Sequence, residues 1–296
     1  MTPALPALLA ARRTVGRREF DFSRQVAVMA IVNRTPDSFW DRGATFALDR
    51  AVSAALAAVD DGADWVDVGG VPFSPDTPEV SVAEESDRVV PLVAAIAERS
   101  DVVISVDTTR APVAAAAIAA GASVVNDTNG VRDPAMVELL SEGRAAVVVT
   151  HSLAAPHTHL PSPRYGDVVG EVATFLRERV DALTAAGIPA DRLFIDPGPD
   201  LNKNTAHTLE LLRRLPEITS IGLPVLAAVS NKDFIGETLD RPPGDRLPGS
   251  LAATTLAVAA GARVVRTHQV AATVDAVRLT EAVLGLREPA YLRHNV

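Results

Sequence analysis

The chain has 296 residues, and its 37 acidic side chains outnumber its 28 Lys and Arg side chains, for a formal net charge of −9 at pH 7. This balance argues against nucleic acid or an anionic membrane surface as the main partner. The absence of cysteine excludes a disulfide framework, a thiolate metal site and a cysteine nucleophile. Hydrophobic residues make up 48% of the chain and aromatic residues only 4%, so we expect a large core of aliphatic side chains.

We expect residues 1–20 to form a flexible N-terminal tail ahead of a single domain over residues 21–296. Arg12 and Arg13 follow the apolar stretch 4–11 instead of preceding it, which is the wrong order for a secretory signal. No apolar run reaches the ~18 residues that a membrane helix needs. These features predict a cytoplasmic protein that does not enter a membrane.

The sequence alternates between short apolar segments and longer helical ones. The first segment, residues 26–32, is almost wholly apolar and breaks at Asn33 into a polar stretch. Continuous β-branched runs of this kind are typical of parallel strands that are buried on both faces. Seven more such strands are predicted at residues 64–68, 102–106, 123–125, 145–149, 192–195, 225–229 and 263–265.

Helical segments lie between and after these strands. Gly62 and Gly121 end two of them, and Ser81 with Glu84 has the spacing of a capping box at the start of another. The predicted helices are residues 46–61, 81–98, 111–120, 133–142, 167–186, 204–215, 248–260 and 270–284. Eight strand–helix units predict one α/β domain, a (β/α)8 TIM barrel. No Gly-x-Gly-x-x-Gly follows the first strand, so the phosphate fingerprint of an open dinucleotide fold is missing.

Polar side chains follow seven of the eight predicted strands. In chain order the strand ends carry Asn33, Gly69-Gly70, Asp107, Asn126, His151, Asp196, Lys232, and Arg266 with His268. In a barrel these ends converge on one mouth, where the active sites of this fold lie. Each residue taken alone is equally well explained as a strand terminator or turn former. Seven of them on one rim favour a binding site.

Two carboxylates and an amide at this mouth, from Asp107, Asn126 and Asp196, provide more hydrogen-bond acceptors than donors. Such a set suits a flat heterocycle, because a carboxylate accepts from adjacent ring and exocyclic N–H groups. We therefore expect a donor-rich ring as the ligand.

Positive charge at the mouth comes from Lys232, Arg266 and His268, and the guanidinium fork of arginine matches phosphate oxygens. Asn33 with Asp37 offers hard oxygen ligands, which Mg²⁺ accepts alongside phosphate and water. The residues alone therefore predict a donor-rich ring with a phosphorylated group; Mg²⁺ as the cofactor is implied by the family resemblance described below.

Eight segments occur together in one order and at characteristic spacings. They read V-M-A-I-V-N-R-T-P-D-S-F, G-A-D-W-V-D-V-G-G, I-S-V-D-T, A-G-A-S-V-V-N-D, I-D-P-G, P-V-L-A-A-V-S-N-K-D-F-I-G, R-L-P-G-S-L-A-A and V-V-R-T-H-Q-V-A-A-T-V. Over residues 26–286 the chain thus resembles dihydropteroate synthase. The resemblance implies a TIM barrel, usually a homodimer, that joins 4-aminobenzoate to 6-hydroxymethyl-7,8-dihydropterin diphosphate and releases diphosphate.

The resemblance also implies roles for individual residues. The pterin would be held by Asp107, Asn126, Asp196 and Lys232, and Ser230 would be a further substrate-binding residue. The diphosphate would be held by Asn33, Arg266 and His268, with Asn33 as a Mg²⁺ ligand. The implied mechanism is dissociative: diphosphate leaves, charge builds on the pterin methylene, and the arylamine attacks. The catalytic set would be Asn33, Asp107, Lys232, Arg266 and His268.

The second loop departs from the family pattern. In the family it reads Gly-Gly-Glu-Ser-Thr-Arg-Pro-Gly, whereas residues 69–76 of this chain read Gly-Gly-Val-Pro-Phe-Ser-Pro-Asp. Phe73 and Ser74 stand in place of its Thr and Arg. A hydroxyl and a cation are therefore missing from the loop that, in the family, closes over the diphosphate.

Further departures lie in the other loops. Asn231 replaces the Arg of the family's Ser-Arg-Lys, and the segment Gly-x-Gly-Phe-Gly-Lys becomes Gly-Pro-Asp-Leu-Asn-Lys over residues 198–203. Its Phe, which packs on the aminobenzoate ring, is Leu201. A Met that packs on the pterin is replaced within Thr-His-Ser, residues 150–152. Arg34 stands for Val in the first loop, and Gln269 stands for the Asp that follows the last-strand His.

These changes leave Asp107, Asn126, Asp196 and Lys232, which would hold the pterin, unaltered. They alter the loop that would close over the diphosphate and the residues that would contact the aminobenzoate ring. Loss of one cation that contacts developing phosphate charge costs orders of magnitude in rate. We interpret the chain as a dihydropteroate synthase homologue with a retained pterin pocket and weak or absent condensation activity. A transferase with a different acceptor and a non-catalytic pterin-binding protein are the alternatives.

Three other features receive plainer interpretations. A metal site from His151, His157 and His159 is disfavoured, because their Pro-flanked loop has no carboxylate set at ligand spacing. Trp40 and Trp65 are expected to be packing residues. The exposed faces of the Ala-rich helices are expected to include a dimer interface.

Overall fold

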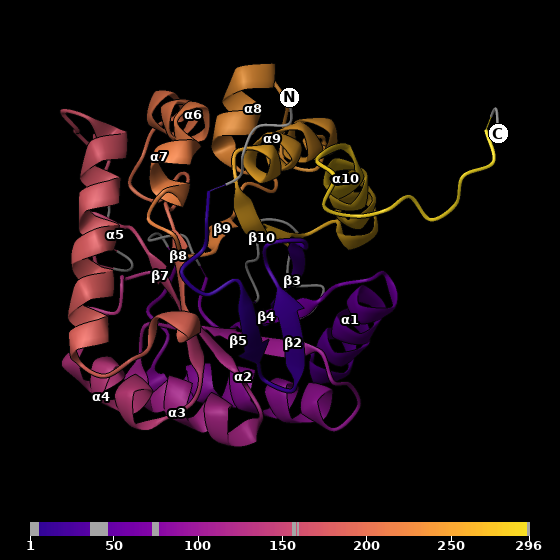
Figure 1. The fold of residues 1–296 in the computed structure, drawn as a ribbon. Helices are drawn as coiled ribbons and strands as arrows, with labels where there is room; N and C mark the ends of the chain where they lie inside the picture. Colours follow the sequence, from indigo (N-terminus) through magenta and orange to yellow (C-terminus); the bar gives the residue numbers. More distant parts are fainter. Residues whose placement is uncertain (1–5, 36–46, 73–76, 156–157, 159, 295–296) are drawn as a thin grey trace.

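The computed structural model describes residues 6–35, 47–72, 77–155, 158 and 160–294. Its centre is a closed barrel of parallel strands in the order β10-β3-β4-β5-β6-β7-β8-β9, with helices around it (Figure 1). The strands are β3 (Ala27–Asn33), β4 (Trp65–Gly69), β5 (Val103–Asp107), β6 (Val124–Asp127), β7 (Ala146–Thr150), β8 (Leu193–Asp196), β9 (Val225–Ala227) and β10 (Ala262–Thr267). The prediction of a (β/α)8 TIM barrel is confirmed.

The predicted helices are present within one or two residues of their expected ends. They are α1 (Leu48–Asp60), α2 (Val82–Ala97), α3 (Ala111–Ala120), α4 (Pro134–Glu142), α5 (Val168–Ala185), α6 (Thr205–Arg213), α9 (Leu247–Ala259) and α10 (Val270–Val283). The N-cap of α2 forms as its sequence indicates, since Ser81 Oγ accepts from the backbone N–H of Glu84 at 3.1 Å.

Two short helices were not predicted, α7 (Leu215–Thr219) and α8 (Asp233–Leu239). Both are too short to show helical periodicity. The start of α8 is stabilised from far away in the chain, because Asp200 Oδ2 accepts from the backbone N–H of Phe234 at 3.1 Å. A cap supplied by a remote residue leaves no local sequence signal.

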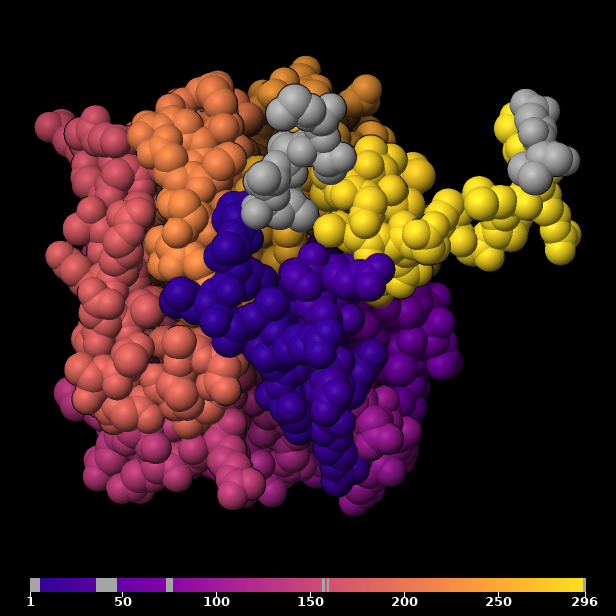
Figure 2. All heavy atoms as spheres, viewed as in Figure 1, coloured from indigo at the N-terminus to yellow at the C-terminus, as the bar shows by residue number. Residues whose placement is uncertain are grey.

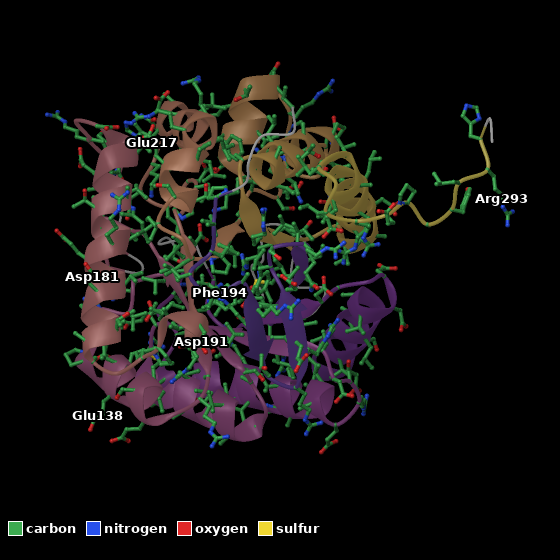
Figure 3. The ribbon with its side chains drawn as sticks, viewed as in Figure 1. Glu138, Asp181, Asp191, Phe194, Glu217 and Arg293 are labelled. Atoms are coloured by element: carbon green, nitrogen blue, oxygen red, sulfur yellow. The ribbon has the colours of Figure 1, made fainter. Side chains whose placement is uncertain are left out.

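Successive residues of each strand face alternately into the barrel and out towards the helices. The outward residues join the aliphatic core between strands and helices. The inward residues at the amino ends form a second, aromatic-rich cluster that includes Trp65 and Phe194, whose ring centroids are 5.1 Å apart. Phe194 lies near the centre of the view in Figure 3. Trp65 is fully buried, so its predicted packing role is confirmed, whereas Trp40 lies outside the described residues.

The chain between Arg12 and Asp21 differs from the expected flexible tail. It forms an antiparallel hairpin of β1 (Arg12–Val15) and β2 (Arg18–Asp21) that lies across one end of the barrel (Figure 2). Phe22 follows the hairpin and packs edge-on against Phe194 at 5.5 Å. The sequence gives a weak signal here, because four-residue strands become stable only when the barrel covers their apolar face.

Candidate active site

Strand register brings the polar strand ends together at one mouth. Asn33 of β3 pairs with Gly69 of β4, and Gly69 pairs in turn with Asp107 of β5. Asp107 pairs with Asn126 of β6. Gly69 leaves room for its neighbour, because a Cβ at this position would lie 2.8 Å from Asn33 Oδ1. Three of the residues predicted from sequence are therefore neighbours on the inner wall.

Arg266 of β10 lies at the centre of this wall. Its Nε donates to Asp67 Oδ2 at 2.6 Å, and its Nη2 donates to Asp107 Oδ2 at 3.1 Å. Asn126 Nδ2 also donates to Asp67 Oδ2, at 3.1 Å. One guanidinium thus joins two carboxylates and, through one of them, an amide.

Asp67 was not among the residues predicted from sequence. It is fully buried in β4, two residues before Gly69 and on the same inward face. The available signal was a charged residue within an otherwise apolar strand, because a buried carboxylate needs a partner.

Two carboxyls at the mouth, those of Asp107 and Asp196, have pKa values above the ordinary value. Burial raises the pKa of Asp107 to about 7; the neighbouring Asp67 adds to the rise and Arg266 opposes it. Burial also raises the pKa of Asp196, an effect that Lys232 opposes. A carboxyl that titrates near neutrality both accepts and donates hydrogen bonds. Such groups match the mixed N–H and ring-nitrogen edges of a heterocycle.

The ends of β9 and β10 meet at the same mouth. Ser230 Oγ accepts from the backbone N–H of His268 at 3.3 Å and from Thr267 Oγ1 at 3.5 Å. Lys232 Nζ donates to the carbonyl of Pro199, in the loop after β8. Burial lowers the pKa of Lys232, which the nearby Asp200 and Asp196 oppose. The structure therefore places Ser230, Lys232 and His268 beside the loops that border the inner wall.

Comparison with known proteins matches this geometry to one family. The profile described as "Pterin binding enzyme" matches residues 29–268 of the chain. The chain belongs to the pterin-binding enzyme family. It is a dihydropteroate synthase homologue, as the resemblance implied.

Three individual proteins illustrate the relationship. Dihydropteroate synthase of Escherichia coli (strain K12) is 40% identical over 261 residues, 88% of this chain and 93% of that protein. A protein of Mycobacterium leprae (strain TN) named inactive dihydropteroate synthase 2 is 45% identical over 268 residues, 88% of this chain and 92% of that protein. The structure of Xanthomonas albilineans dihydropteroate synthase in complex with 7,8-dihydropteroate superimposes with a TM-score of 0.82 at 41% identity, over 92% of this chain and 98% of that chain.

Two departures from the dihydropteroate synthase pattern contact each other. Asn231, in the position of the family's Arg, donates from Nδ2 to Oε1 of Gln269 at 3.0 Å. Gln269 stands in the position of the family's Asp. Asn231 is fully buried, and its backbone N–H donates to Ser250 Oγ at 2.9 Å. A neutral amide pair thus joins the loops after β9 and β10.

The loop after β8 carries Asp200 and Asn202 where the family segment has glycines. Both residues have left-handed backbone conformations, with φ of 61° and 48° respectively. Asp and Asn tolerate this region better than most residues. Asp200 Oδ1 accepts from Thr208 Oγ1 at 2.8 Å, and its other oxygen caps α8, so this side chain ties the loop to two helices.

Asn202 ties the same loop to the one after β7. Its Oδ1 accepts from Ser152 Oγ at 2.7 Å and from the backbone N–H of Ala154 at 3.0 Å, and its backbone carbonyl accepts from Tyr165 at 3.0 Å. Glycine has no side chain to make the first two bonds. In this homologue the wall beside Leu201 is therefore held in one shape by side-chain hydrogen bonds.

His151 supports this wall from beneath. Lys203 Nζ lies 2.9 Å from its Nδ1, and Phe175 packs edge-on against its ring at 4.9 Å. Burial, with a contribution from Lys203, lowers the pKa of His151 to about 3. Within the described residues no group of three or more His, Cys, Asp or Glu is placed to hold a metal ion, and His157 and His159 lie outside them.

The first and second loops are described only in part. Arg34 Nη1 donates to the backbone carbonyl of Arg88 on α2 at 2.7 Å, so its charge is engaged with that helix. Asp37, Phe73 and Ser74 lie outside the described residues. None of the helices in the described ranges combines the length and apolar character needed to span a bilayer.

The acidity of Asp107 predicts a pH-dependent stability. Its pKa is 3.8 in an ordinary environment and about 7 in the fold, so the folded state binds more protons between these pH values. The free energy of unfolding of the wild type is expected to fall, by on the order of 2–4 kcal/mol, as pH rises from about 4 to about 7. Asp107→Asn is expected to flatten this slope in urea denaturation. An equal slope in wild type and variant contradicts the prediction, and Asp181→Asn on α5 is the surface control.

Asn202→Ala tests the hydrogen-bonded loop. Alanine loses both side-chain bonds and is strained at a left-handed backbone, so we expect the free energy of unfolding to fall by about 2–3 kcal/mol. Asn202→Gly loses the bonds without the strain and is expected to cost less. Urea denaturation measures the free energy of unfolding of both variants. An alanine variant as stable as wild type shows that the hydrogen bonds of Asn202 do not stabilise the loop.

Proposed function

We propose that this dihydropteroate synthase homologue binds a reduced pterin at the barrel mouth and condenses it with 4-aminobenzoate slowly or not at all. The observation that carries the proposal is the buried cluster of Arg266 with Asp67, Asp107 and Asn126. It preserves the acceptor-rich wall that suits a pterin edge. The altered residues, by contrast, gather in the loops around it.

In this proposal the residues of the inner wall bind the pterin. Asp107, Asn126 and Asp196 accept from or donate to its ring edges, and Lys232 contributes positive charge beside Asp196. The M. leprae relative of similar length is named inactive, and the X. albilineans structure is named as a complex with 7,8-dihydropteroate. These relatives support pterin binding without ordinary synthase activity.

Diphosphate would be bound at the rim by Asn33, Arg266, His268 and Ser230. Asn33 offers a carboxamide oxygen, a hard donor that fits Mg²⁺ when phosphate oxygens and water complete its shell. When bound, Mg²⁺ neutralises charge on the leaving diphosphate.

We expect slow condensation because of the altered residues in the loops around the inner wall. Arg266 is already paired with two carboxylates, and the second cation of the family's Ser-Arg-Lys is replaced by Asn231 in a neutral pair with Gln269. Fewer unpaired cations face the leaving group, which weakens the stabilisation of its developing charge. Leu201 also replaces the aromatic surface for the aminobenzoate ring.

A second candidate is a transferase with a different acceptor. It is favoured by the loop after β8, in which Asp200 and Asn202 form side-chain hydrogen bonds that glycine cannot form. A loop that had only lost its function would not need these hydrogen bonds. This alternative shares the pterin site and differs only in the second substrate.

The decisive experiment combines calorimetry with an activity assay. Calorimetry with 6-hydroxymethyl-7,8-dihydropterin is expected to show binding. With Mg²⁺ and both ordinary substrates at saturation, turnover is expected to be at least about 100-fold below that of the E. coli enzyme under the same conditions. Turnover at the E. coli rate refutes the loss of activity, and calorimetric silence refutes the pterin pocket.

We also propose that the protein is a cytoplasmic homodimer that associates through α9 and α10. These helices expose apolar side chains: Leu256 is 64% exposed, Leu279 67% and Val283 74%. The whole of α9 carries no charged residue, which is unusual for a helix that faces water. Beyond α10 the chain extends away from the body (Figures 1 and 2) and exposes Tyr291 and Leu292.

Leu279→Arg tests this interface. A charge in the middle of an apolar contact is expected to shift the protein from dimer to monomer in light scattering after size exclusion, while pterin binding is retained. Asp181→Arg on α5 is a matched surface control and should remain dimeric. A dimeric Leu279→Arg variant places the interface elsewhere.

A further inference from the structure

The inner wall of the barrel holds buried polar atoms without hydrogen-bond partners among the described residues. They lie on four consecutive strands, β4 to β7, and are Asp67 Oδ1, Ser105 Oγ, Asn126 Oδ1 and Thr150 Oγ1. Leaving a buried donor or acceptor unpaired costs free energy, so their accumulation in one place indicates a ligand that satisfies them. Three of these residues lie in segments that match the family, whereas Thr150 lies in the segment 150–152, within which the family carries a Met.

Thr150 faces the inside of the barrel. Val147 and Val149 of β7 belong to the outer core, and Ala146 and Val148 belong to the inner cluster, so the next inward residue is Thr150. It pairs in register with Asp196, and its side chain is only 1% exposed. Its hydroxyl therefore belongs to the same ring of inward groups as the Asp196 carboxyl.

We propose that the Thr150 hydroxyl binds the ligand directly, through a hydrogen bond to the edge of the heterocycle that lies between Asn126 and Asp196. A hydroxyl both donates and accepts, whereas a thioether is at most a weak acceptor. Thr150 thus favours a ring with an oxo group or ring nitrogen at this edge over one with a C–H group there. The inference rests on the proposed pterin pocket and adds a specificity-determining residue to it.

Thr150→Val is the direct test, because valine keeps the shape of threonine and removes the hydroxyl alone. Calorimetry with 6-hydroxymethyl-7,8-dihydropterin is expected to show binding about 5- to 10-fold weaker than to wild type. The unliganded variant is expected to be as stable as wild type or more so in urea denaturation, because the hydroxyl has no hydrogen-bond partner among the described residues. Thr150→Ser keeps the hydroxyl and is expected to restore affinity to within about twofold of wild type.

Thr219→Val is the matched control. Thr219 is 2% exposed, and its hydroxyl donates to the carbonyl of Ala260 at 3.1 Å, outside the pocket. This variant is expected to lose stability and keep its affinity for the pterin, the reverse of Thr150→Val.

Three outcomes overturn the inference. Equal affinity of wild type and Thr150→Val removes Thr150 from the site and leaves the pterin pocket standing. Loss of affinity with an equal loss of unliganded stability assigns the hydroxyl a structural role instead. Absence of pterin binding to wild type removes both the inference and the proposed function.

Discussion

The buried pairing of Arg266 with Asp67 and Asp107 is the interaction on which the site depends. A charge in a protein interior is costly unless it is paired and hydrogen-bonded, and here one guanidinium pairs with one oxygen of each of two carboxylates from different strands. Arg266 lies on β10, which reaches β4 and β5 only across β3, through closure of the barrel. The polar wall therefore exists because the sheet is closed, and the apolar layers beneath it keep water away from its charges.

The two ends of the barrel are built differently. At the amino end, Phe22 and the hairpin before it cover Trp65 and Phe194, so this end contributes stability through apolar burial. At the mouth, carboxyls with raised pKa values remain, together with hydroxyls that have no hydrogen-bond partner among the described residues, at a cost in stability. A site that accepts this cost in an otherwise well-packed barrel is prepared for a polar ligand.

The departures from the family pattern lie in the loops around the mouth and leave the hydrogen bonds of the inner wall in place. Asn231 and Gln269 keep the loops after β9 and β10 joined while removing charge, and Asp200 and Asn202 replace flexible glycines by residues that hold the next loop in place. Each change is compensated locally by hydrogen bonds. The described loops are therefore held in place by side-chain hydrogen bonds at the positions where the sequence departs from the family.

The pattern of residues is enough to predict the barrel, since eight apolar strands alternating with helices have few other ways to bury their faces. It also predicts that Asn33, Asp107, Asn126, Asp196 and Arg266 lie at one mouth, because parallel strands bring their carboxyl ends to the same rim. Which of these groups become partners depends on the folded chain. Asp67 reaches Arg266 199 positions away, Asp200 caps a helix 34 positions away, and the hairpin of Arg12–Asp21 is ordered by the barrel end that covers it. These contacts join segments that are distant in the chain, and their strength depends on burial, which local sequence patterns do not record.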